Sequence, residues 1–156
     1  MEKIAGVVSV ESDLTTRYKA MLAWVESLLG EARIEALAGD LSYRRYFRVF
    51  VADQTLILMD APAEVESSQS FVRIAHAFFK LGVRTPRILH QDLDRGFLLL
   101  EDFGDQLYLS ALNDESADML YKCALDSLSL IAQCGVVEGY SIPVFSRQTY
   151  WGELAW

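Results

Sequence analysis

Three arginines, Arg44, Arg45 and Arg48, lie close together in a chain that is otherwise acidic. Guanidinium groups bind phosphate oxygens through charge-assisted hydrogen bonds. The residues before them suit the same task, because glycine permits close backbone approach and serine can donate a hydroxyl hydrogen bond. The segment therefore predicts a local anion site, which we assign to Gly39, Asp40, Ser42, Arg44, Arg45 and Arg48.

This segment has no G-x-G-x-x-G or Walker A pattern, so the motif itself is weak. The competing interpretation is a hairpin whose arginines lie in solvent. Strand alternation also separates the arginines, because Arg44 and Arg48 share one side of a strand and Arg45 lies on the other. Arg44 and Arg45 can face one ligand together only if the chain bulges there, so the arginine that contacts phosphate stays open.

A second candidate is the stretch GFLLLEDFGD, which spans Gly96 to Asp105. Its Asp102 carries a carboxylate, a ligand that Mg²⁺ prefers. The alternative is a strand that runs into a turn, with solvated carboxylates and a glycine that makes the bend. Whether Asp102 is a metal ligand or a solvated turn residue depends on the elements that surround it in the sequence.

The bulk composition predicts one globular domain with a substantial core. The chain has 156 residues, of which 52% are hydrophobic, and its formal net charge is −8. A broad electrostatic footprint for nucleic acid or for an anionic membrane is therefore not expected. Any phosphate must be held locally.

The cysteines and the N-terminal residues indicate a cytoplasmic protein. Cys123 and Cys134 lie far from both histidines, so no metal-ligand spacing results, and we expect buried free thiols. The apolar residues of the segment 4–10 are too few for a signal peptide or a membrane span.

The hydrophobic periodicity predicts an α+β chain. Expected helices cover Asp13–Leu29, Ser67–Leu81, Leu107–Leu112 and Ser116–Gln133, with Gly30 and Gly82 as stops. Expected strands cover Arg33–Ala38, Tyr46–Val51, Thr55–Met59, Arg87–His90 and Phe97–Leu100. The order is therefore three strands, a helix, a hairpin and then further helices.

Four segments carry a resemblance to a known family: Leu37–Val49, Leu58–Pro62, Phe71–Ile74 and Gly96–Asp105. Together they resemble the aminoglycoside phosphotransferase family of small-molecule kinases, and within it the bacterial anomeric kinases of N-acetylated amino sugars in cell-wall recycling. The resemblance runs from about Ala20 to the end of the chain.

The resemblance implies a protein-kinase-like fold. Residues 1–103 would form the nucleotide-binding N-lobe, a five-stranded antiparallel sheet with one packed helix and an N-terminal helix. Residues 104–156 would begin a helical, truncated C-lobe, and we expect the chain to stop inside a helix that starts near Thr149.

The resemblance also gives Asp102 a different role. In kinases a metal-binding Asp-Phe-Gly follows a catalytic loop, and no such loop precedes Asp102. The tripeptide would instead lie at the crossing between the lobes, where backbone groups face the adenine. We therefore expect Leu100, Glu101, Asp102 and Phe103 to bind the nucleotide.

The third strand departs from the family pattern. Kinases of this fold usually place a lysine or arginine there, but Met59 stands at or near that position and Asp60 follows it. Asp60 would repel phosphate unless a cation lay between them. We assign Met59 to the nucleotide site and expect an arginine of the preceding loop to replace the missing cation.

The implied function is an ATP-dependent kinase that uses Mg²⁺ and phosphorylates the anomeric hydroxyl of an N-acetylated amino sugar. The catalytic aspartate, the metal ligands and the sugar site are expected outside these 156 residues, so no catalytic or metal-binding residue is assigned. We expect the chain by itself to be inactive, and its exposed apolar surface to favour dimerisation.

Two alternatives stay open. One is another kinase of the family, acting on an aminoglycoside, a choline-like alcohol or another sugar. The other is a non-catalytic kinase-like module that binds a nucleotide or a partner protein, which the missing third-strand cation favours.

Overall fold

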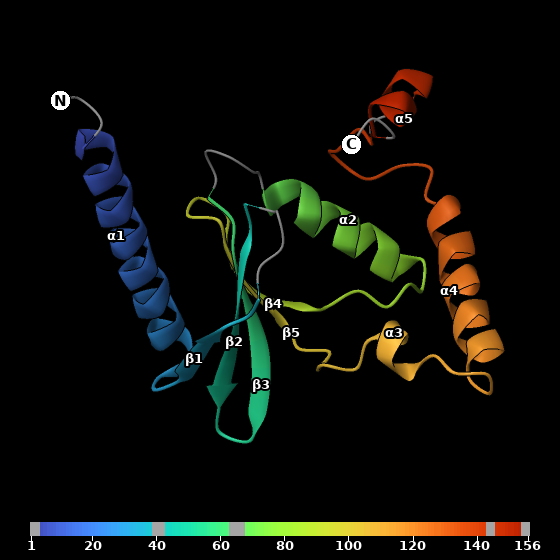
Figure 1. Cartoon of the computed structure of the whole chain (residues 1–156), viewed down its shortest axis with the longest axis horizontal. Coiled ribbons are helices and arrows are strands. Elements are labelled where there is room, and N and C mark those ends of the chain that lie inside the picture. The colour runs from blue at the N-terminus through green and yellow to red at the C-terminus, as the bar shows by residue number, and fades with distance from the viewer. Residues whose placement is uncertain (1–3, 39–42, 63–67, 143–145, 154–156) are drawn as a thin grey trace. The chain divides into compact units, whose positions relative to one another are not determined.

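The computed structural model describes residues 4–38, 43–62, 68–142 and 146–153 (Figure 1). The chain divides into two compact units. The first contains Met1–Ser68 and Pro86–Asp105, and the second contains Gln69–Thr85 and Gln106–Trp156. Each unit is described by itself.

The first unit contains an antiparallel sheet. Its strands are β1 (Arg33–Ala36), β2 (Arg45–Val51), β3 (Gln54–Asp60), β4 (Ile88–Asp92) and β5 (Phe97–Glu101). They form one five-stranded sheet in the order β1-β2-β3-β5-β4. The predicted α+β class and the predicted five-stranded antiparallel sheet are confirmed.

Two hairpins set the register of this sheet. In the first, β2 turns at Ala52 and Asp53 into β3, and Ala52 has the positive φ of 48° that such a tight turn requires. In the second, β4 pairs with β5 with a register shift between Ile88 and His90. Both predicted hairpins are present, but the first turn was expected at Asp53 and Gln54 and lies one residue earlier, so Gln54 already belongs to β3.

The core of the first unit lies between α1 (Ile4–Leu29) and one face of the sheet. Apolar residues at helical spacing on α1 contact apolar residues at alternate positions of three strands. The apolar face of the helix and the apolar face of the sheet therefore bury each other. The cluster consists of Met21, Trp24, Val25, Phe47, Val49, Leu56, Leu58, Phe97 and Leu99.

The start of α1 differs from the prediction. The helix begins at Ile4, not at Asp13, whereas its predicted end at Leu29 and the stop at Gly30 are confirmed. The segment before Asp13 contains no proline, and one glycine at position 6 costs only about 1 kcal/mol, so helix propagation continues through it.

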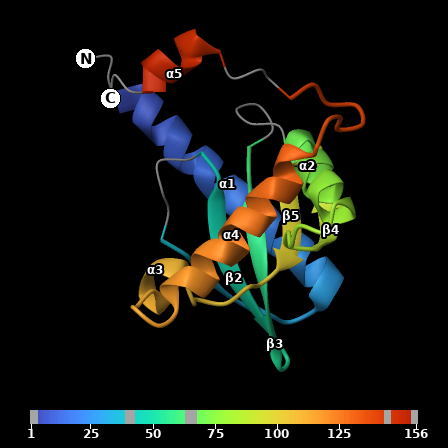
Figure 2. The same ribbon diagram turned by 90° about the vertical axis from the view of Figure 1, so that its right-hand side faces the viewer.

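The second unit is helical. It contains most of α2 (Ser68–Lys80), together with α3 (Tyr108–Ala111), α4 (Ala117–Ala132) and α5 (Arg147–Glu153). The helices predicted before Gly82 and around Ser116–Gln133 are confirmed, and α4 follows α3 directly along the chain (Figure 2). The packing of α2 against the sheet stays a prediction.

The predicted burial of the cysteines is wrong. Cys123 is exposed and Cys134 is only partly buried, although both are free thiols. Cys123 lies on α4, in which no residue is buried, and Cys134 lies just beyond the end of that helix. Within the part of the chain that the structure describes, no helix is long and apolar enough to cross a membrane.

Candidate functional site

The predicted nucleotide-site residues fall into three groups. Gly39, Asp40 and Ser42 lie outside the described residues. The arginines lie on β2 or directly before it, and Met59 lies on β3. Leu100 and Glu101 end β5, and Asp102 and Phe103 follow it directly. All the described members of the set belong to the first unit.

The register separates these residues by face. Arg48 pairs with Ile57, and Ile57 pairs with Leu100, so these three side chains share one face. Met59 lies two residues beyond Ile57 and faces the same way. This face is opposite to the one that α1 covers. The predicted separation of Arg48 from Arg45 is confirmed.

Arg45 lies on the face that α1 covers and pairs with Asp60. Its Nε lies 3.0 Å from Asp60 Oδ2, and its terminal nitrogen contacts the same oxygen. From α1, Arg17 Nε donates to Asp60 Oδ1 at 2.8 Å. Asp60 is completely buried, so two guanidinium groups compensate one buried carboxylate. We call this group the Asp60 triad.

The Asp60 triad answers a question that the sequence raised. Asp60 was expected to need a cation between itself and phosphate, and the structure provides two cations from α1 and β2. A second hydrogen bond of 2.6 Å joins Arg17 Nη2 to the carbonyl oxygen of Arg95. The triad therefore attaches α1 to the sheet, on the face opposite to Met59.

Arg48 forms a second cluster where β5 ends. Its Nε donates to Asp102 Oδ2 at 2.8 Å, and its Nη2 donates to Asp105 Oδ1 at 2.7 Å. Asp102 also accepts the backbone N–H of Gly104 at 2.8 Å. The side chain of Asp102 is only 4% exposed, whereas that of Asp105 is 80% exposed. We call these residues the Arg48 cluster.

The Arg48 cluster keeps its acids charged. Burial alone would raise the pKa of Asp102, but hydrogen bonds from the Gly104 amide, from Thr55 and from Arg48 outweigh it and hold that pKa below the ordinary 3.8. The hydrogen bond from Arg48 likewise lowers the pKa of Asp105. The same contacts raise the pKa of Arg48. At neutral pH the cluster is therefore a cation between two carboxylates.

A pH dependence follows from the lowered pKa of Asp102. A carboxyl whose pKa falls on folding stabilises the protein above its unfolded-state pKa, and the contribution is lost as the pH falls through the folded-state value. We therefore expect Asp102→Asn to reduce the free energy of unfolding at neutral pH and to matter progressively less below about pH 4. Urea unfolding of both proteins at several pH values measures this.

Arg48→Met provides the matched comparison, because it removes the cation and leaves the carboxyl in place. Its destabilisation should shrink over the same acidic range. A destabilisation by Asp102→Asn that stays constant from neutral to acidic pH would contradict the assignment.

The end of β5 leaves a short segment of chain beyond the sheet. Glu101 is the last residue of β5 that pairs with β3, opposite Leu56. Its N–H donates to the carbonyl oxygen of Arg87 at 2.9 Å. Phe103 is 49% exposed. An extended strand end beside an apolar face can present backbone donors and acceptors to a planar ligand.

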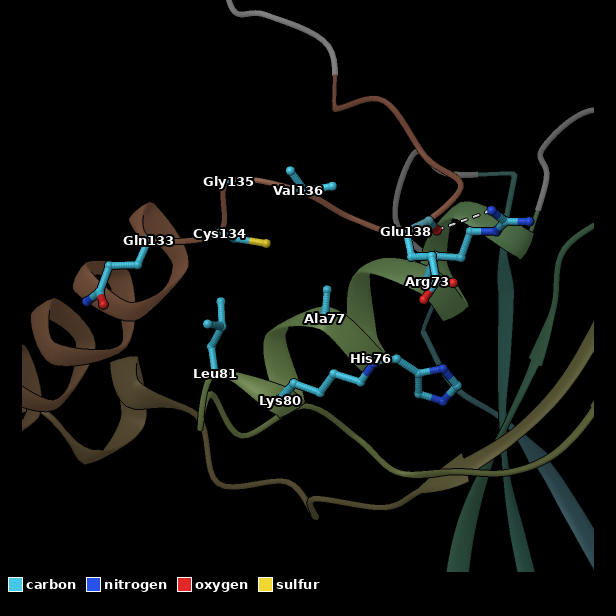
Figure 3. A pocket seen from close by; sticks show the side chains of 10 residues that line it. All are labelled: Arg73, His76, Ala77, Lys80, Leu81, Gln133, Cys134, Gly135, Val136 and Glu138. Carbon is cyan, nitrogen blue, oxygen red and sulfur yellow. Dashed lines mark hydrogen bonds between the residues drawn. The ribbon is translucent and has the colours of Figure 1, made fainter.

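The second unit contains a cavity that sequence analysis did not identify (Figure 3). Its volume is about 570 Å³, and it lies between α2 and the segment that follows α4. It is lined by Arg73, His76, Ala77, Lys80, Leu81, Gln133, Cys134, Gly135, Val136 and Glu138. None of the predicted site residues lines it. The one sequence signal is that residues 68–91 contain no acidic residue in a chain of net charge −8.

Arg73 forms one wall of this cavity. Its Nη1 donates to the carbonyl oxygen of Glu138 at 3.2 Å, as Figure 3 shows. A Cβ atom on Gly139 would lie 1.6 Å from that nitrogen, and Gly139 has a φ of 66°. The glycine therefore permits the close approach of the arginine.

The structure holds no ready metal centre in its described ranges. Among residues 4–38, 43–62, 68–142 and 146–153 there is no group of three or more His, Cys, Asp or Glu residues that could hold a metal ion. The described acids Asp60 and Asp102 are both paired with arginine.

Comparison with curated proteins identifies relatives of one name. The chain is 37% identical over 147 residues to the N-acetylmuramate/N-acetylglucosamine kinase of Pseudomonas aeruginosa, covering 85% of the chain and 44% of the relative. It is 43% identical over 106 residues to the protein of that name from Pseudomonas putida, covering 68% and 31%. The protein of that name from Neisseria meningitidis is 28% identical over 138 residues, covering 84% and 40%.

These relatives are all longer than the matched region. The chain spans less than half of the length of each of the three. No protein-family model matches the sequence. The chain is therefore similar to proteins named as sugar kinases over most of its own length.

Proposed function

We propose that this chain is the nucleotide-binding part of an ATP-dependent kinase that phosphorylates the anomeric hydroxyl of N-acetylmuramate or N-acetylglucosamine. The observation that carries the proposal is the 37% identity to a protein of that name over 85% of the chain. The protein-kinase-like fold, the aminoglycoside phosphotransferase family, a cytoplasmic location and a role in cell-wall recycling belong to the same proposal.

The nucleotide would lie on the face of the sheet opposite to α1. Ile57, Met59, Leu98 and Leu100 point to this side of the sheet. Met59, Leu98 and Leu100 are buried, so the base would pack at the margin of this apolar layer, beside the half-buried Ile57. The adenine edge would pair with backbone groups of Glu101 to Phe103 at the end of β5. Arg44 precedes the same side of β2 and is the arginine that we place nearest the phosphates.

Mg²⁺ would neutralise negative charge on the phosphates during transfer, with ligands outside the described residues. Within the chain, Arg45 has a different task, since it compensates Asp60. Its predicted contact with the nucleotide would require it to leave a buried carboxylate, so we favour Arg44 as the replacement for the missing third-strand cation.

Two measurements on the purified protein test the proposal. Calorimetric titration with ATP and Mg²⁺ should show binding, and Arg44→Met should weaken ATP more than adenosine. The 156-residue chain is expected to bind ATP without transferring phosphate from γ-labelled ATP to N-acetylmuramate. Absence of ATP binding would contradict the proposed site, and sugar phosphorylation by the chain would contradict the expected inactivity.

A non-catalytic nucleotide-binding or partner-binding module is the second candidate. The observation that favours it is Met59, which is fully buried where kinases of this fold usually carry a cation. A full-length form that binds ATP but phosphorylates no amino sugar, aminoglycoside or choline would support this candidate. If that form phosphorylated an aminoglycoside or choline, it would be a kinase of a different substrate class.

A further inference from the structure

We propose that Arg48 is a positioning residue that fixes the backbone leaving β5, and that it does not bind the phosphates of the nucleotide. The inference rests on the proposed function, because this backbone is where we place the adenine edge. It also changes the role expected for Arg48 from sequence, where Arg48 was grouped with the phosphate-binding arginines.

The first step of the argument is that two carboxylates bind all three nitrogens of the guanidinium group. Arg48 Nε lies 2.8 Å from Asp102, Nη1 lies 2.8 Å from Asp105, and Nη2 lies 2.7 Å from Asp105. Every nitrogen of the group therefore has a carboxylate oxygen at hydrogen-bond distance. A phosphate that took the place of Asp102 would leave this nearly buried carboxylate without its cation.

The second step is the path of the Arg48 side chain. Arg48 lies on β2 and Asp102 follows β5, while β3 lies between those strands in the sheet. The side chain therefore crosses β3 to reach its partners. Thr55 of β3 also hydrogen-bonds to Asp102. The cluster joins three strands to the residues that leave the sheet.

The third step concerns the turn itself. Asp102 accepts the N–H of Gly104, two residues further along the chain, as in an Asx turn. Gly104 has a φ of 78°, a conformation that favours glycine. Because one carboxylate accepts from both Arg48 and the turn, Arg48 fixes the direction in which the chain leaves β5. Donors and acceptors held in place before binding lose less entropy when a ligand arrives.

The experiment compares ATP with adenosine, which has no phosphates. In Arg48→Met we expect the affinities for both ligands to fall by the same factor, about tenfold, because the adenine-binding backbone is less ordered. A phosphate ligand would behave differently, since its loss weakens ATP and leaves adenosine unchanged. That second outcome overturns the proposal.

Arg95→Met is the matched control. Arg95 belongs to the same unit, and its side chain forms an exposed ion pair with Asp92 in the β4–β5 turn. The Arg95→Met substitution changes charge and side-chain type in the same way as Arg48→Met, but at a site away from the end of β5. Unchanged affinity for both ligands in this variant is expected, and an equal loss there would overturn the assignment to Arg48.

A measurement without nucleotide separates this inference from the proposed function. Amide hydrogen exchange at Gly104 should be faster in Arg48→Met than in the wild type and in Arg95→Met. Unchanged exchange overturns the positioning role whatever the affinities are. If the wild type binds neither ligand, the proposed function fails, and faster exchange still supports the positioning role. Should Arg48→Met not fold, Arg48→Lys provides the comparison, because lysine keeps the charge but cannot bind Asp102 and Asp105 through three nitrogens.

Discussion

Asp60→Asn is expected to lower the free energy of unfolding by about 3 kcal/mol, because it leaves two guanidinium groups facing a neutral amide. The side chain of Asp60 is 0% exposed, and those of Arg17 and Arg45 are 21% and 34% exposed. Partial solvation of the arginines moderates the loss, so we expect the lower end of the range for breaking a buried ion pair. Urea unfolding at neutral pH measures it.

Glu35→Gln is the control for this prediction. Glu35 also pairs with an arginine, Arg33, but both side chains are more than half exposed on the edge strand β1. Loss of this exposed ion pair should lower the free energy of unfolding by no more than about 1 kcal/mol. Arg45→Met should cost less than Asp60→Asn, because Arg17 still compensates the carboxylate. Equal stability of Asp60→Asn and Glu35→Gln would show that the Asp60 triad does not stabilise the fold.

The sheet was predictable because its signals are local. Residue type and alternation mark β2 and β3, so both strands and their pairing follow from a few neighbouring residues. The turn between them lies one residue earlier than expected, because Ala52 adopts a positive φ that its residue type does not indicate. The continuous apolar run Phe97–Leu100 predicts a strand buried on both faces, and all four residues are buried. The alternation of side chains along a strand also correctly predicted that Arg45 and Arg48 lie on opposite faces of β2.

The contacts of those arginines were not predictable, because they join residues far apart in sequence. Arg17 and Asp60 are 43 positions apart, and Arg48 and Asp102 are 54 positions apart. Arg17 lies on a helix whose pattern identifies its apolar residues but not the partner of a charged one. Sequence placed all three loop arginines near phosphate, whereas the structure pairs two of them with aspartates.

The helical unit shows a different limit. Periodicity predicted α4 and its apolar positions, but periodicity does not say what covers them. Leu128, one of the residues expected on the apolar face, remains 58% exposed. The predicted burial of Cys123 failed for the same reason. The cavity beside α2 depends on Arg73 and Glu138, which are 65 positions apart, so only the folded chain reveals it.

Phe97→Ala is expected to destabilise the protein by about 3–5 kcal/mol, the usual cost of removing a buried aromatic ring. Phe97 is 1% exposed and begins β5 within the core cluster. Its ring centroid lies 5.8 Å from that of Trp24, and Arg17 lies over the same ring at 4.8 Å. The change therefore leaves a cavity between α1 and the sheet and also removes a contact of the Asp60 triad.

Phe97→Leu separates these two effects. Leucine fills most of the space but provides no aromatic face for Arg17, so we expect a smaller loss, of about 1–2 kcal/mol. The exposed ring of Phe79 on α2 gives the control, and Phe79→Ala should change stability by less than about 1 kcal/mol. Urea unfolding of all three variants tests the order. If Phe97→Ala lowered the free energy of unfolding no more than Phe79→Ala, α1 would not be packed on the sheet as described. The face that carries Phe97 would then not be the one that forms the core.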